Sequence, residues 1–259
     1  MKRITFFLVL CSFSAFAQPK TLTHAVITAK TTLNIPEDIA SQGEEQGFMG
    51  MSNGDETKVV TWFKNDMLKI VNDGGRGRTT IIMDRKNKKT TTLIEMMGKR
   101  FGYYSTAEDE AAMTKRMDSI NLKHGNKKTT VDIDYLPDTK KIAGYNCRKA
   151  LIKTHHEIGK TDSMYVWYTP DIKMADTYTF RSGMSGFGGG RGSVNSGFEN
   201  LNGFPMQYQV QMPRGMTFTI EVTKIDTDKN IEDKEFDIPK DFELKPVKDM
   251  QGGGPPFRM

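Results

Sequence analysis

Hydrophobic and polar residues alternate along most of the chain with a period of two, which is typical of antiparallel strands. Short polar and glycine-containing segments interrupt the alternation and favour turns. The pattern therefore predicts a meander of hairpins. Its expected strands are 22–33, 58–64, 67–72, 78–84, 90–96, 129–135, 145–153, 163–169, 206–212, 216–222 and a short edge strand at 236–239.

The clearest hairpin joins MQYQVQM (206–212) to MTFTIEV (216–222) through Pro213-Arg214-Gly215. In each strand the apolar residues occupy alternate positions, and glutamine, threonine or glutamate occupies the others. Because side chains of a strand point to opposite faces in turn, every apolar side chain of the pair lies on one side. The sequence predicts a hairpin with one dry face and one wet face.

One helix is predicted at about 106–119. Ser105-Thr106-Ala107-Glu108 has the capping-box pattern, and Ala112, Met113, Met117 and Ile120 then fall along one side. The expected fold class is mainly β (α+β), a single antiparallel meander sheet with one main helix packed against it.

The N-terminus is typical of a secretory signal peptide. Lys2 and Arg3 precede an apolar stretch, and Ala15-Phe16-Ala17 forms an A-x-A cleavage site. We interpret 1–17 as the signal, in preference to lipidation at Cys11, because Leu10 is not the small residue that lipidation requires. No later stretch has the ~20 apolar residues of a membrane span. The mature chain is expected to be exported, either periplasmic or associated with the outer membrane.

The mature chain divides into one β-domain, 18–245, and a Gly/Pro tail, 246–259, predicted to be disordered. Within the domain, 36–56 and 182–203 are predicted to be long loops. The second contains the glycine-rich run SGMSGFGGGRGSVNSGF (182–198). A phosphate cradle would need Gly-Lys-Ser/Thr at the start of a helix, which this run lacks. We interpret it as a flexible connector.

Composition excludes several classes of function. After the signal only Cys147 of the two cysteines remains, so no internal disulfide can form. Loss of Lys2 and Arg3 lowers the formal net charge from +5 by two. The remaining basic residues are scattered, which does not favour nucleic acid as a partner.

The residues with the most reactive chemistry do not form recognisable sites. Cys147 is expected to be a small packed residue rather than a redox thiol. His155-His156 lacks the further ligands of a zinc site. Methionine pairs such as Met49/Met51 and Met96/Met97 lack the repeats that we expect for Cu(I). No catalytic motif is present, so we predict no enzyme activity, no metal and no cofactor.

Three stretches carry a resemblance to a known family: Lys140–Cys147 (KKIAGYNC), Val166–Pro170 (VWYTP) and Gly203–Met206 (GFPM), followed by Phe236-Asp237-Ile238-Pro239. Together they resemble a domain-of-unknown-function family of exported proteins, similar in layout to the periplasmic lipoprotein carriers LolA and LolB. The resemblance implies an antiparallel β-sheet curled into an unclosed barrel, whose concave apolar face holds acyl chains in the carriers.

Two functional hypotheses follow. In the first, the protein is a non-enzymatic binding protein for a lipid or for lipoprotein acyl chains. The residues expected to line its apolar pocket are Trp62, Tyr208, Val210, Met212, Met216, Phe218 and Ile220. In the second, the protein is a structural or interaction protein of the cell envelope, with its own side chains filling the barrel and its long loops contacting envelope proteins.

Overall fold

The computed structural model describes residues 19–40, 53–74, 77–123, 130–155, 161–174, 197–211 and 213–250. The predicted signal peptide, most of the glycine-rich run and the last nine residues lie outside this described part. The strands within it are β1 (Lys20–Leu22), β2 (His24–Asn34), β3 (Glu56–Lys64), β4 (Met67–Gly74), β5 (Gly77–Asp84), β6 (Lys89–Met96), β7 (Lys99–Ser105), β8 (Thr130–Ile142), β9 (Tyr145–His155), β10 (Thr161–Thr169), β11 (Ile172–Met174), β12 (Phe204–Gln211), β13 (Thr217–Asp226) and β14 (Glu243–Pro246).

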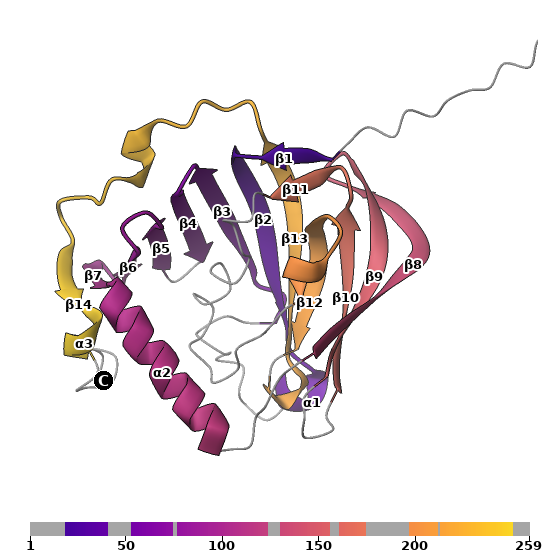
Figure 1. Cartoon of the computed structure of the whole chain (residues 1–259), viewed down its shortest axis with the longest axis horizontal. Helices are drawn as coiled ribbons and strands as arrows, with labels where there is room; N and C mark the ends of the chain where they lie inside the picture. The colour runs from indigo at the N-terminus through magenta and orange to yellow at the C-terminus, as the bar shows by residue number, and fades with distance from the viewer. Residues whose placement is uncertain are drawn as a thin grey trace, which may run out of the picture.

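Twelve of the described strands form one open sheet in the order β14-β7-β6-β5-β4-β3-β2-β13-β12-β10-β9-β8. Two antiparallel meanders meet where β2 pairs with β13, and β14 adds a parallel edge strand beside β7. The sheet curves into an arch that does not close, because its edges β14 and β8 lie apart (Figure 1). The predicted fold class, a mainly β protein built on one open antiparallel sheet, is confirmed.

Helices are few in the described part of the chain. They are α1 (Glu37–Ala40), α2 (Ala107–Lys123), α3 (Val247–Met250) and three short 3₁₀ segments, η3 (Phe198–Asn200), η4 (Pro213–Gly215) and η5 (Asp233–Phe236). None of these helices is long and apolar enough to cross a membrane.

The predicted main helix is present as α2, and it begins one residue later than its capping pattern suggested. Thr106 is the N-cap: its backbone N–H donates to Asp109 Oδ2 (2.8 Å), and Asp109 N–H donates to Thr106 Oγ1 (3.4 Å). The hydrogen bond from the Thr106 backbone lowers the pKa of Asp109. The capping box is therefore Thr106/Asp109 rather than Ser105/Glu108. Ala112, expected on the buried side of the helix, is exposed.

The C-terminal part of the chain departs most from the sequence prediction. Residues 236–239 do not form an edge strand, because η5 ends at Phe236 and residues 237–239 pair with no strand. The edge strand is β14, which starts at Glu243. The predicted disordered tail begins with the last residue of β14 and one helical turn, α3, before the described residues end at Met250.

The two faces of the sheet are both apolar in the half that contains β2–β6. Ala25, Val26 and Ile27 are consecutive in β2 and all are buried, so both faces of this strand are covered. We call the face that includes Ala25 and Ile27 the inner face and the face that includes Val26 the outer face. The C-terminal segment, residues 227–242, crosses the outer face on its way from β13 to β14 (Figure 1).

Gly203, in the Gly-Phe-Pro stretch before β12, permits a close backbone approach that no other residue allows. Its φ is +155°, and an added Cβ would lie 2.8 Å from Cδ2 of Tyr168 and still closer to the carbonyl oxygen of Thr169. Both neighbours belong to β10, which pairs with β12. The glycine therefore lets the incoming chain lie directly on the end of β10.

Gly203→Ala is predicted to lower the free energy of unfolding by about 3 kcal/mol or more, because a strained backbone and a steric clash coincide. The matched control is Gly144→Ala in the β8–β9 turn, where φ is +86° and no atom lies within 4 Å of the new Cβ. Backbone strain alone should cost it about 1–2 kcal/mol. If urea denaturation showed equal losses of unfolding free energy for the two variants, this account of Gly203 would be contradicted.

Candidate functional site

The residues predicted to line an apolar pocket fall into two groups in the structure. Tyr208 and Val210 of β12 lie directly opposite Ile220 and Phe218 of β13 on the inner face, and Met216 belongs to the same buried cluster. The predicted dry face of this hairpin is thus present. Met212 lies outside the described residues.

The inner face of this hairpin is closely packed. Tyr208 and Phe218 are each 3% exposed, and the Tyr208 ring meets the Phe198 ring edge-on at a centroid distance of 4.8 Å. Complete burial raises the pKa of the Tyr208 hydroxyl far above its ordinary value. These side chains fill space around one another as core residues do. Their role in holding a ligand stays a prediction.

Trp62 does not lie with the other predicted pocket residues. It pairs with Val26 of β2 and Lys69 of β4, and it packs on the outer face with the cluster that contains Val26, Ile82 and Leu93. The reason is visible in its strand: the run Val59-Val60-Thr61-Trp62-Phe63 has apolar residues at both parities. Alternation therefore predicts the strand but does not say which face is inner.

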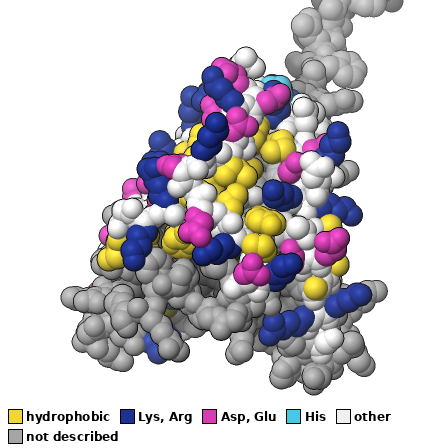
Figure 2. All heavy atoms as spheres, turned by 90° about the vertical axis from the view of Figure 1, so that its left-hand side faces the viewer, with side chains coloured by type: hydrophobic (Ala, Val, Ile, Leu, Met, Phe, Trp, Pro, Cys, Tyr) yellow, Lys and Arg dark blue, Asp and Glu magenta, His cyan; other side chains and the backbone are white. Residues whose placement is uncertain are grey.

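The C-terminal segment covers part of this outer apolar face. Ile231 and Phe236 are 3% and 6% exposed and pack against Val26, Ile82 and Leu93. Burying each such side chain contributes about 1.5–3 kcal/mol. Figure 2 looks at the left-hand side of Figure 1 and shows a band of hydrophobic side chains with basic and acidic ones on both sides.

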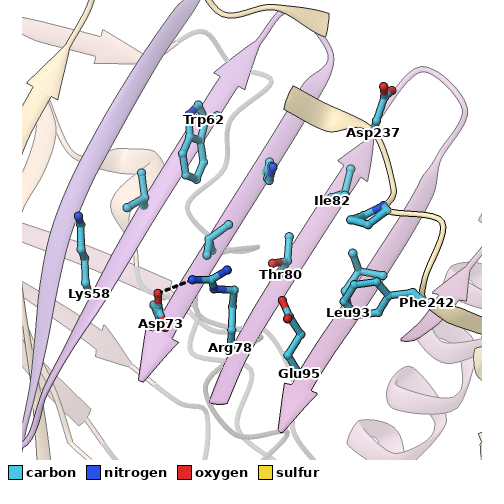
Figure 3. A pocket seen from close by; sticks show the side chains of 14 residues that line it. Lys58, Trp62, Asp73, Arg78, Thr80, Ile82, Leu93, Glu95, Asp237 and Phe242 are labelled. Carbon is cyan, nitrogen blue, oxygen red and sulfur yellow. Dashed lines mark hydrogen bonds and ion pairs between the residues drawn. The ribbon is translucent and has the colours of Figure 1, made fainter. Parts of the chain in front are cut away.

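A groove of about 390 Å³ remains open beside the C-terminal segment. Val60 and Val71, which face each other across β3 and β4, form its floor with Leu93 of β6. Pro239 and Phe242 of the C-terminal segment line its side, and Figure 3 shows Phe242 beside Leu93. The groove thus joins four strands, β3–β6, to a segment that follows them by more than 140 residues in the sequence.

The two ends of the groove differ in chemistry. At one end Lys69 lies between Trp62 and Ile82, with its ammonium group 5.4 Å from the Trp62 ring centroid and bound to the Glu235 carbonyl oxygen. The Trp62 indole N–H there is buried without a hydrogen-bond acceptor among the described residues. At the other end Lys58, Arg78 and neighbouring carboxylates form a charged row (Figure 3). An apolar floor with polar groups at its ends suits a ligand that is amphipathic.

Cys147, considered as a reactive thiol, is a packed residue, as predicted. It is fully buried in the inner cluster with Phe204 and Met206, and its thiol donates to the Tyr145 carbonyl oxygen at 3.5 Å. Burial raises the pKa of the thiol, which disfavours the nucleophilic thiolate.

The other candidate ligands for metals are separated or already bonded. His155 is the last residue of β9, and its ring nitrogens lie 3.0 Å from Thr161 Oγ1 and from Asp132 Oδ2. Met97 is exposed in the β6–β7 turn, whereas Met206 and Met216 are core residues. His156 and the Met49/Met51 pair lie outside the described residues. Within the described ranges, no three His, Cys, Asp or Glu side chains are grouped to hold a metal ion.

Comparison of the sequence with protein families identifies the family of this chain. Residues 49–242 fit the family DUF4412, described as a domain of unknown function. The chain belongs to the DUF4412 family. The predicted resemblance to a family of unknown function is confirmed. No curated protein matches the chain in sequence.

Solved structures resemble this DUF4412 protein only distantly. PNGF-II shares 14% identity over 88% of this chain with a TM-score of 0.37, and the chain spans about a third of its length, 32%. The LolA superfamily protein NE2245 from Nitrosomonas europaea shares 7% identity, with a TM-score of 0.33 over 85% of this chain and 92% of its own. A putative outer membrane lipoprotein-sorting protein domain from Vibrio parahaemolyticus shares 8% identity, with a TM-score of 0.23 and coverages of 85% and 91%. Likenesses this weak carry no argument about function.

Thiol labelling tests the packing of Cys147. With a thiol-reactive chromophore at pH 8, the native mature chain is predicted to react at least about a hundredfold more slowly than the same chain in denaturant, because the raised pKa and burial both suppress the thiolate. Comparable rates in the two conditions would show an accessible thiol and contradict the packed assignment.

Proposed function

We propose that this DUF4412 protein is an exported, non-enzymatic binding protein that holds the apolar chain of a lipid or of an acylated protein in the outer groove. The observation that carries the proposal is the groove itself, about 390 Å³ with an apolar floor, left open between β3–β6 and the C-terminal segment. Ligand pockets of proteins commonly measure about 300–1,000 Å³. The predicted signal peptide supports action in the periplasm or at the outer membrane.

The energetics of the groove favour an acyl chain over a small polar ligand. Each CH₂ group moved from water to an apolar surface contributes about 0.8 kcal/mol. Val60, Val71 and Leu93 provide such a surface, and Phe242 encloses it from the side. The C-terminal segment leaves part of this apolar surface in contact with water. The chain of a bound ligand would cover that part.

The hypothesis of a filled barrel is supported by a different observation. Tyr208, Val210 and Phe218 are all buried among neighbouring side chains of their own chain on the inner face. This packing supports a structural role for the inner face, and in that hypothesis envelope proteins bind to other surfaces. The two hypotheses differ in whether the purified protein carries a lipid.

Val71→Glu is predicted to abolish ligand retention, because a carboxylate on the groove floor would be desolvated by a bound chain. The test is native mass spectrometry and organic extraction of residues 18–259 purified from a periplasm without detergent. The wild-type protein should carry a lipid or acylated species at near one-to-one ratio. The matched control is Gln209→Glu, which adds the same charge at an exposed position of β12.

Phe218→Leu distinguishes the groove from the inner face, because it perturbs the predicted inner pocket while keeping an apolar side chain. If the groove holds the ligand, this variant retains it and Val71→Glu does not. The reverse pattern would move the ligand to the inner face. A wild-type protein without any ligand, which also fails to bind added lipids, would support the filled barrel.

A further inference from the structure

A row of charged side chains crosses the outer face at one end of the groove. Lys58, Asp73, Arg78, Glu95 and Arg100 are successive register partners on β3, β4, β5, β6 and β7. Directly opposite residues of antiparallel strands have their Cβ atoms about 4.5–5.5 Å apart, so Asp73, Arg78 and Glu95 each have an oppositely charged neighbour on both sides. The row contains three cations and two anions.

Each carboxylate of this row pairs with the arginine on the neighbouring strand nearer to β7, and Arg100 also pairs with Asp241 of the C-terminal segment. Arg100 Nε lies 3.2 Å from Glu95 Oε2, and Arg78 Nη2 donates to Asp73 Oδ2 at 2.8 Å. The hydrogen bond and the charge of Asp73 raise the pKa of Arg78. Both carboxylates of the row are therefore engaged by arginines. Among the described residues, none accepts a hydrogen bond from the Lys58 ammonium group or forms an ion pair with it. Figure 3 shows Lys58 at the edge of the groove.

Lys30 adds a second positive charge at the same end. It lies directly opposite Lys58, on β2, where like charges repel. Lys30 has its own partner, because its ammonium group lies 3.4 Å from Glu56 Oε1. An anion at Lys58 would relieve the repulsion between the two lysines and meet a group that has no other partner.

We infer that the ligand is an anionic amphiphile, with a carboxylate or phosphate at one end of its apolar chain, and that Lys58 binds this anionic group. The inference rests on the proposed function. Lys58, Val60 and Trp62 alternate along the outer face of β3, so a head group at Lys58 directs the chain along Val60 and Val71 toward Phe242. Trp62 follows Val60 on the same face of β3, beside this path, and its indole N–H is buried without an acceptor among the described residues.

Binding of three probes with the same acyl chain tests the inference: palmitate, palmitoyl lysophosphatidate and the neutral glycerol monopalmitate. Isothermal titration of delipidated residues 18–259 should show that both anions bind about tenfold more tightly than the neutral probe, the size expected for one charge-assisted contact. The difference should shrink at high salt because the contact is partly exposed.

Lys58→Met removes the charge and keeps an apolar stem. In this variant the anionic probes should fall to the affinity of glycerol monopalmitate, whose own affinity stays unchanged. The matched control is Lys141→Met on β8, at the opposite edge of the sheet, which should retain the preference. A Lys58→Met variant with an intact preference, or a wild-type protein that binds all three probes equally, would overturn the inference and leave the proposed function standing.

Two further outcomes distinguish an amphiphile from a free anion, and a failure of this inference from a failure of the proposed function. Inorganic phosphate at equal concentration should not displace palmitate, and displacement would show a site for a free anion and overturn the assignment to an amphiphile. If none of the three probes binds, both the inference and the proposed function fail.

Discussion

Two lysines on adjacent strands hold the C-terminal segment on the outer face, and the position of the groove depends on them. Lys64 of β3 donates from Nζ to the Ile231 carbonyl oxygen at 2.8 Å and lies 2.7 Å from Asp233 Oδ1. Lys69 of β4 donates to the Glu235 carbonyl oxygen at 2.7 Å. Hydrogen bonds from charged donors to backbone carbonyls are stronger than neutral ones. They place Ile231 and Phe236 over the apolar surface near Val26.

The path of the C-terminal segment also determines which part of the outer face stays uncovered. The segment packs on Ile82 and Leu93 and contributes Pro239 and Phe242 to the side of the groove, whereas Val60 and Val71 stay on its open floor. A sheet that is apolar on both faces must cover both, because exposed apolar surface is costly in water. The inner face does so with packed clusters such as that of Phe63 and Met206. The outer face does so incompletely, and its open part is the groove.

The elements that could be predicted are those that depend on local pattern. The β12–β13 hairpin has its apolar residues at a single parity, so its strands, turn and dry face all followed from the sequence. Strand β7 was missed, and its short alternation around Phe101 and Tyr103 is the signal that could have found it. The Phe236–Pro239 stretch looks like a strand, but Phe236 is buried by tertiary contacts rather than by pairing.

The groove could not be predicted, because it needs information that alternation lacks. The run around Trp62 is apolar at both parities, so its outward direction depends on β2 and on the C-terminal segment. Lys58 resembles any solvated lysine in the sequence. The register places Asp73 opposite both Lys58 and Arg78, and Lys58 lacks a partner because Asp73 pairs with Arg78 instead.

Photolabelling tests most directly whether the outer groove is the ligand site. The wild-type protein is loaded with a photoreactive diazirine analogue of palmitate, irradiated, digested and mapped by mass spectrometry. Our account predicts labels in the peptides that contain Val60, Val71 and Phe242, because Phe242 is distant in sequence from the two valines and lines the same groove. Labels confined to the peptides of β12 and β13, around Tyr208 and Phe218, would contradict it and place the ligand on the inner face.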